Sequence, residues 1–180
     1  MRSLTPGLHG NPSRRASGLT LIELLVTVSV LAVLLALGVP SFASLMQRWR
    51  VDATIESLVA DIRLARSTAT RTSRPVVMCA KAIDGSCSAG NDWSTGWVVF
   101  SDLNGDSALD AGEPLIVERP IQSGMASMPD KTNRAKLKFR ANGTLESGKT
   151  SVGIRPSDSA KAVASIVINA MGRIRVQTIN

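Results

Sequence analysis

The chain contains one long apolar run near its N-terminus. Sixteen residues, 24–39, carry no charge, and residues 19–22 extend the run across a single acidic residue, Glu23. A helix needs about 20 apolar residues to cross a bilayer. The run is therefore long enough for one membrane span, and we predict a transmembrane helix over residues 19–47.

An amphipathic pattern follows this run. Apolar residues recur mostly three or four positions apart as far as Ala69, with charged residues between them, which is typical of a helix that buries one face. Pro40 lacks a backbone donor, so we expect it to kink or interrupt the helix. The helix should end before Pro75, because the residue preceding a proline is pushed out of helical geometry. We predict an amphipathic helix over about 43–72 that packs on a sheet.

The pattern from residue 75 to 180 is that of short strands. Several runs are rich in β-branched residues and are bounded by Gly, Pro, Asn and Asp, and one segment alternates strictly between charged and apolar residues. The predicted strands are 76–79, 97–100, 115–117, 136–140 and 163–168, and the last hairpin turns at 169–172. A helix followed only by antiparallel strands makes an α+β domain. Residues 48–180 are enough for one soluble domain with its own core.

Two cysteines lie in the first part of this strand-rich region. Cys79 and Cys87 are eight positions apart around Asp84-Gly85, which is a turn signal. In an oxidising exterior they would close a short loop, and we favour a disulfide over two free thiols. Two cysteines and the distant His9 do not make a zinc site.

Glu23 places a carboxylate inside the apolar run, where an ionisable group is costly without a partner of opposite charge. The stretch Gly18-Leu-Thr-Leu-Ile-Glu-Leu-Leu-Val26 closely resembles the N-terminal signature of type IV prepilins and type II secretion pseudopilins. The resemblance implies cleavage by a prepilin peptidase between Gly18 and Leu19 and removal of the leader 1–18. It also implies N-methylation of Leu19 and a contact between Glu23 and the terminal amine of a neighbouring subunit.

An ordinary signal peptide or a plain single-span anchor is the alternative. A signal peptide has a small-residue cleavage site after its apolar core, and residues 37–40 make a poor site of that kind. Arg14 and Arg15 precede the span, which favours a cytoplasmic N-terminus, although Arg48 and Arg50 follow it. The predicted topology therefore rests mainly on the resemblance, which implies a single-pass inner-membrane protein with a periplasmic C-terminal domain.

The strand-rich part resembles one particular group of these proteins. Trp93 to Phe100, Asp102-Leu-Asn-Gly-Asp106 and Gly172-Arg-Ile-Arg175 are similar to the GspH/FimT group of minor pseudopilins and minor pilins. Such a relationship implies the type IV pilin-like fold, with one long kinked helix on an antiparallel β-rich domain. In the FimT branch a Gly-Arg-x-Arg motif is linked to DNA capture in natural transformation, and its arginines here are Arg173 and Arg175.

Charge is unevenly distributed along the chain, whose formal net charge is +7. Residues 84–118 carry seven acidic and no basic residues, whereas residues 119–180 carry eleven basic and three acidic ones. A basic terminal section attracts polyanions such as DNA through phosphate contacts that are independent of sequence and sensitive to salt.

Five basic residues are the candidates for DNA contact. Lys136, Lys138 and Arg140 alternate along one predicted strand and so share one face. Arg173 and Arg175 do the same on the last strand, and we predict that all five contribute to a basic face for double-stranded DNA. The alternatives are an ordinary solvated strand face or a surface that complements an acidic neighbouring subunit.

One acidic loop resembles a calcium-binding site in the spacing of its oxygen-bearing residues. Its oxygen-bearing residues fall at positions one, three, five, nine and twelve of a window that resembles an EF-hand loop: Asp102, Asn104, Asp106, Asp110 and Glu113. The sixth position, which is normally glycine, is Ser107, and strands rather than helices flank the loop. We interpret the loop as a hairpin turn and predict no metal site.

Catalysis has little support in the sequence. The sole histidine, His9, lies in the predicted leader, so the mature chain offers no Ser-His or Cys-His pair. No glycine-rich phosphate loop precedes a helix. We expect no enzymatic activity, no catalytic residue and no cofactor.

Two functions compete within this interpretation. The first is a type IV minor pilin that assembles with other minor pilins and holds double-stranded DNA for uptake. The second is a GspH-like pseudopilin of the type II secretion system that contacts other subunits or secreted cargo. The arginine pair at the C-terminus favours the first.

Overall fold

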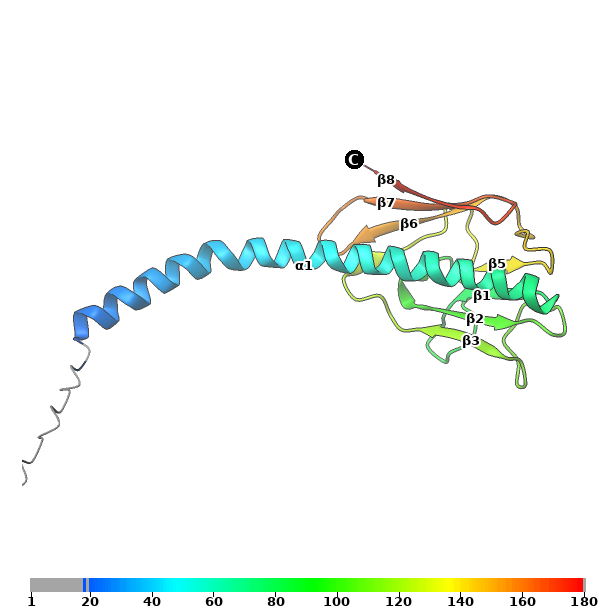
Figure 1. The fold of residues 1–180 in the computed structure, drawn as a ribbon, viewed down its shortest axis with the longest axis horizontal. Helices are drawn as coiled ribbons and strands as arrows, with labels where there is room; N and C mark the ends of the chain where they lie inside the picture. Colours follow the sequence, from blue (N-terminus) through cyan, green and yellow to red (C-terminus); the bar gives the residue numbers. More distant parts are fainter. Residues whose placement is uncertain (1–17, 19, 180) are drawn as a thin grey trace, which may run out of the picture. The chain divides into compact units, whose positions relative to one another are not determined.

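The computed structural model describes residue 18 and residues 20–179, and in this part of the chain it contains one α-helix and eight strands (Figure 1). The chain divides into two units, Met1–Phe42 and Ala43–Asn180, which are described separately. The predicted boundary at residue 48 lies within the second unit. The predicted leader 1–18 and Leu19 lie outside the described residues, apart from Gly18.

Helix α1, Leu21–Thr72, contributes to both units. Pro40 was expected to kink or interrupt the helix. An interruption is wrong, because α1 is helical on both sides of this residue and through it, and a kink stays a prediction. A proline removes only one donor from the helix, and the remaining backbone bonds maintain the helical path. The helix ends at Thr72, as predicted, and Ser73 then adopts a positive φ of 53°.

The first sheet of the second unit is antiparallel and has the strand order β3-β2-β1-β5. Its strands are β1 (Val76–Ala80), β2 (Trp97–Ser101), β3 (Leu115–Arg119) and β5 (Lys136–Phe139), and the 3-10 turn η1 (Trp93–Thr95) precedes β2. All four strands were predicted. The β-branched runs in β1 and β2 are buried along their whole length, because these two strands occupy the centre of the sheet.

The second sheet has the order β4-β6-β7-β8 and is also antiparallel. Its strands are β4 (Met125–Ser127), β6 (Thr150–Pro156), β7 (Ala164–Ile168) and β8 (Ile174–Thr178). The sequence did not predict β4 or β6. Strand β4 has only three residues, and β6 contains both Gly153 and Pro156, which weaken a strand pattern.

One core unites the helix and both sheets. Leu58 and Ile62 of α1 are fully buried together with Trp97 of the first sheet and Ile154 and Ile166 of the second. Figure 1 shows α1 passing beside both groups of strands. A smaller cluster, Val77, Cys79, Val98 and Phe100, lies on the first sheet. The α+β prediction of a long helix packed on an antiparallel β-rich domain is confirmed.

Candidate functional site

The start of α1 presents Glu23 in a helix cap. The backbone N–H of Glu23 donates to Oγ1 of Thr20 at 3.3 Å, and the N–H of Leu24 donates to the Thr20 carbonyl. Thr20 thus occupies the N-cap position and Glu23 the third helical position, the spacing of a capping box. A carboxylate in this first turn is also favoured by the helix dipole. The Thr-x-x-Glu spacing is visible in the sequence, and it adds a capping position to the predicted assembly role of Glu23.

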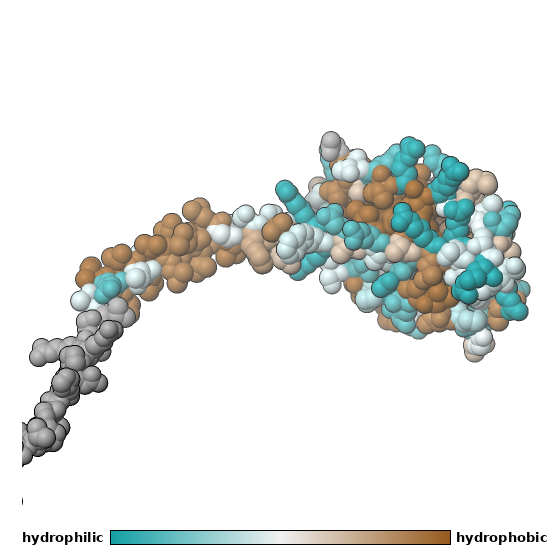
Figure 2. Space-filling model, in the orientation of Figure 1, coloured by the Kyte–Doolittle hydropathy of each residue, from teal (hydrophilic) through white to brown (hydrophobic). Residues whose placement is uncertain are grey.

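The apolar half of α1 exposes its side chains along its length. Within this part of the helix the leucines and valines from Leu24 to Val39 are more than half exposed, and the helix is long and apolar enough to cross a membrane. Figure 2 shows the corresponding hydrophobic surface. Such a surface needs lipid or neighbouring apolar helices to cover it.

Cys79 and Cys87 form a disulfide, with their Cα atoms 5.5 Å apart. Cys79 is buried in β1, and the eight-residue loop also contains a turn at Asp84. The hydroxyl and the backbone N–H of Ser86 donate to Asp84 and lower the pKa of this carboxyl below its ordinary value. The disulfide and the Asp84 turn together hold a short exposed loop beside the first sheet.

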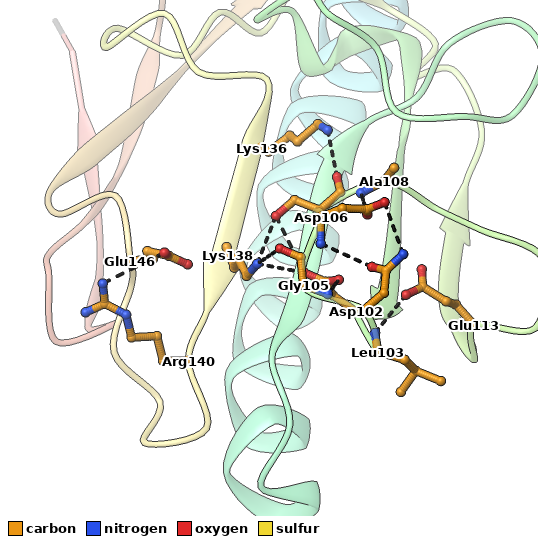
Figure 3. A network of polar contacts seen from close by, with 12 residues as sticks. Asp102, Leu103, Gly105, Asp106, Ala108, Glu113, Lys136, Lys138, Arg140 and Glu146 are labelled. Carbon is orange, nitrogen blue, oxygen red and sulfur yellow. Dashed lines mark hydrogen bonds and ion pairs between the residues drawn. The ribbon is translucent and has the colours of Figure 1, made fainter.

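Lys136 and Lys138 bind the loop between β2 and β3 (Figure 3). Nζ of Lys138 lies 2.8 Å from Oδ2 of Asp102, whose side chain is fully buried, and it also donates to the Gly105 carbonyl at 2.8 Å. Nζ of Lys136 donates to the Ser107 carbonyl at 2.6 Å. Both ammonium groups therefore stabilise the acidic loop, a role that sequence reasoning missed.

The acidic loop satisfies most of its oxygens internally. Oδ1 of Asp106 accepts from the N–H of Ala108 at 2.7 Å, and this bond lowers the pKa of Asp106 below its ordinary value. Oε1 of Glu113 accepts from the N–H of Leu103 at 2.7 Å. In the part of the chain that the structure describes, no group of three or more His, Cys, Asp or Glu residues is placed to hold a metal ion. The arrangement is that of a closed hairpin loop.

A groove between α1 and the turn before β8 gathers three arginines. Its lining includes Arg63 and Arg66 of α1 with Gly172 and Arg173, and its volume is about 530 Å³. Among the described residues, none of the three arginines forms an ion pair with a carboxylate. Sequence reasoning found Arg173 and missed Arg63 and Arg66, because they were interpreted as solvated positions of an amphipathic helix.

The structure separates the predicted basic face into two places. Lys136, Lys138 and Arg140 lie in or just after β5 of the first sheet, and Arg140 is 3.9 Å from Glu146. Arg173 and Arg175 lie in the second sheet or just before its last strand, where Arg175 is opposite Val167 of β7. Only Arg173 of this pair lines the arginine groove. The part of all five residues in DNA binding stays a prediction.

An ion pair with a buried carboxylate joins the helix to the first sheet. Asp61 of α1 accepts from Nε and Nη2 of Arg119 at 2.7 and 3.0 Å and from the indole N–H of Trp97 at 2.9 Å. The hydrogen bond to Asp61 raises the pKa of Arg119. No spacing rule connects residues that are 58 positions apart, so the sequence alone held no signal for this pair.

Comparison with known proteins places this architecture in a family. Residues 54–172 match the family model described as type II transport protein GspH, which is well over half of the chain. The chain belongs to the GspH family. Residues 13–39 also match the prokaryotic N-terminal methylation motif. This motif implies processing by a prepilin peptidase and assembly with other pilins, and it supports membrane anchoring through the apolar helix.

Individual relatives agree with this assignment. The type IV narrow pilus major component PilA5 of Thermus thermophilus is 29% identical over 84 residues, which are 45% of this chain and 72% of PilA5. Two crystal structures of the type IV minor pilin FimU of Pseudomonas aeruginosa are 20% identical and have TM-scores of 0.58 and 0.50. They cover 74% and 70% of this chain and 92% and 91% of FimU, and at this identity the likeness shows the fold alone. The predicted pilin-like family is confirmed.

Proposed function

We propose that this GspH-family pilin is anchored in the inner membrane and is a minor subunit of a type IV pilus-like filament. We also propose that it binds double-stranded DNA for natural transformation. The observation that carries the DNA-binding part is the groove in which Arg173 lies with two further arginines, without a carboxylate partner among the described residues. Arginine is well suited to phosphate oxygens because its planar fork donates several hydrogen bonds.

Processing and topology are part of the same proposal. The peptidase cuts between Gly18 and Leu19, Leu19 becomes the methylated first residue, and the C-terminal domain faces the periplasm. The match of residues 13–39 to the methylation motif supports this proposal. Intact-mass and N-terminal peptide analysis of the protein from membranes should find N-methyl-leucine at position 19. A mature N-terminus at any other residue would contradict it.

Glu23 is the proposed assembly contact. In a bundle of apolar helices its carboxylate needs a positive group, and the free amine of Leu19 on a neighbouring subunit supplies one. A pairing in the wrong register would leave the carboxylate buried without compensation, which is costly. The structure adds that the Glu23 backbone N–H is already bound by Thr20. We propose that the side chain is what the neighbouring subunit uses.

The DNA-binding part is tested with the full chain in a neutral detergent. Fluorescence anisotropy of a labelled duplex across a salt series should show micromolar binding that weakens steeply with salt, since each phosphate contact contributes a log–log slope of roughly −0.9. Arg173→Ala/Arg175→Ala should abolish most of this binding. Arg140→Gln tests the predicted residue just after β5, whose side chain lies near Glu146 and not on the acidic loop. Absence of wild-type binding at low salt would overturn DNA binding and leave the filament role.

The second candidate is a pseudopilin of the type II secretion system. The description of the matching family model as a type II transport protein favours it. In this case the basic residues complement an acidic subunit or cargo. A deletion strain discriminates the two functions: loss of transformation with normal protein secretion supports the DNA-binding pilin, and the reverse phenotype supports the pseudopilin.

A further inference from the structure

The arginine groove is built by two segments that are distant in sequence. Arg63 and Arg66 are three positions apart on α1, which places them on the same side of the helix. Gly172 and Arg173 form the opposite wall in the turn that leads into β8. The Gly-Arg-x-Arg motif and the helix arginines therefore meet at one site, although about a hundred residues separate them.

Gly172 has no side chain, and this leaves the space that the side chain of Arg66 occupies. Its φ is 72°, in the region that favours glycine. A Cβ at this position would lie 2.8 Å from the carbonyl oxygen of Gly143 and 2.9 Å from both Cδ and Nε of Arg66. The first of these atoms is backbone and moves with difficulty. The glycine of the motif thus makes room for a helix side chain as well as allowing the turn.

The guanidinium of Arg66 is held in place through a hydrogen bond from its Nε atom. Nε donates to the carbonyl oxygen of Gly143 at 3.1 Å, and Arg66 is half-buried, whereas Arg63 and Arg173 are exposed. A guanidinium fixed through Nε keeps its two terminal nitrogens for an acceptor in the groove. A side chain that is ordered before binding loses less conformational entropy when a ligand arrives.

Charge identifies the class of ligand. Three arginines line the groove, and among the described residues none of them is ion-paired with a carboxylate, so the groove favours an anion. None of the residues that line the groove is aromatic. Base stacking, which single-strand binding surfaces use, therefore has no platform here. The ligand that fits is a backbone phosphate and not a base.

We infer that Arg63 and Arg66 of α1 together with Arg173 form a phosphodiester seat, in which Gly172 and Gly143 position Arg66. This inference rests on the proposed DNA-binding function and deepens it, because the contact surface then extends from the C-terminal motif to the helix. The seat binds the phosphate of duplex DNA through charge-assisted hydrogen bonds. Binding is therefore independent of base sequence.

The test compares two double variants with equal change in charge. Arg63→Gln/Arg66→Gln alters the seat, whereas Arg48→Gln/Arg71→Gln removes two arginines of the same helix that do not line the groove. Anisotropy with a labelled 30-base-pair duplex is measured for the full chain in neutral detergent across a salt series. The seat variant should bind roughly 10- to 50-fold more weakly at about 0.1 M salt and lose up to about two units of log–log slope. The control should change affinity by less than about threefold.

Arg66→Lys provides a second, milder variant. Lysine retains the charge but has no Nε–H for the Gly143 carbonyl and no planar fork. We expect weaker binding by about fivefold with a nearly unchanged salt slope, and melting curves by circular dichroism show whether the fold persists. Gly172→Ala should weaken binding in the same direction, because the new Cβ displaces Arg66.

The outcomes separate this inference from the proposed function. If the wild-type chain binds DNA and Arg173→Ala/Arg175→Ala abolishes binding, but the seat variant behaves like the control, the phosphodiester seat is overturned and the DNA-binding function stands. If the wild-type chain fails to bind duplex DNA at low salt, the function itself is overturned and the seat with it. Equal losses in the seat and control variants would show a diffuse charge effect and would also overturn the seat.

Discussion

Asp61 in the C-terminal part of α1 and Arg119 at the end of β3 form a two-point ion pair, with Nε 2.7 Å from Oδ2 and Nη2 3.0 Å from Oδ1. The carboxylate is buried, whereas 42% of the arginine side chain is exposed. Trp97 donates to the same oxygen as Nε does. The pair therefore connects the helix, the central strand β2 and the edge strand β3.

Loss of the arginine should destabilise the folded unit. Arg119→Met leaves the buried Asp61 with only the Trp97 donor, and we expect the free energy of unfolding to fall by about 2 kcal/mol, less than for a fully buried pair because water reaches the arginine. Urea unfolding of the full chain in detergent, followed by circular dichroism, measures this change. Lys81→Met is the matched control, since its pair with the exposed Glu118 contributes less than about 1 kcal/mol. Equal effects of both variants would contradict the assignment.

The ion pair between Lys138 and Asp102 should stabilise the acidic loop. Lys138→Met removes the cation beside the buried Asp102 and should lower the free energy of unfolding by about 3 kcal/mol. Arg140→Met, whose partner Glu146 is 3.9 Å away and exposed, should cost less than about 1 kcal/mol. The same urea experiment compares the two variants. A Lys138→Met protein as stable as wild type would show that the loop does not depend on this lysine.

The disulfide should stabilise the chain through its short loop. Replacing both cysteines, as Cys79→Ala/Cys87→Ala, frees a loop of eight residues in the unfolded chain, which corresponds to about 2–3 kcal/mol in the chain-entropy model. Adding reductant to the wild-type protein should shift its urea midpoint in the same direction. Insensitivity of the wild type to reductant, with free thiols detected by mass spectrometry, would mean that the cysteines are not bridged in the cell.

Glu23→Ala should separate processing from assembly. We expect the precursor to be cleaved and to remain in the membrane fraction. Its incorporation into sheared filaments should fall at least tenfold, because the terminal amine of the neighbouring subunit then has no carboxylate to contact. Quantitative immunoblots of membrane and filament fractions measure this effect. Ser29→Ala is the control, since its hydroxyl donates to the Leu25 carbonyl of its own helix at 2.8 Å. Normal incorporation of Glu23→Ala would remove Glu23 from the assembly mechanism.

Acid should loosen two exposed turns. Hydrogen bonds from Ser86 lower the pKa of Asp84, and the N–H of Ala108 lowers that of Asp106. A lowered pKa means that the stabilising contribution is present above the ordinary aspartate pKa of about 3.9 and is lost as the pH falls through the lower folded value. The amide resonances of Ser86 and Ala108 should therefore titrate with midpoints below about 3.9. Midpoints at or above that value would contradict these contacts.

The sequence by itself determined the parts of this protein that depend on local pattern. The apolar run, the helical spacing after it and the β-branched runs were enough to predict α1, its end at Thr72 and most strands, because side-chain periodicity directly reports burial on one face. The turn residues around Asp102 likewise predicted a hairpin loop. The weak patterns of β4 and β6 escaped detection because short strands and strands with Gly or Pro lose that periodicity.

Only the tertiary structure decided which charges act together. Lys138 was predicted to face DNA, yet its ammonium group lies against buried Asp102, since β5 is next to β1 and within reach of the loop after β2. Arg66 and Gly172 meet because α1 packs beside the turn before β8. Such contacts depend on which strands pair and on how the helix crosses them. These long-range arrangements are set by the shared core and leave no trace in the spacing of neighbouring residues.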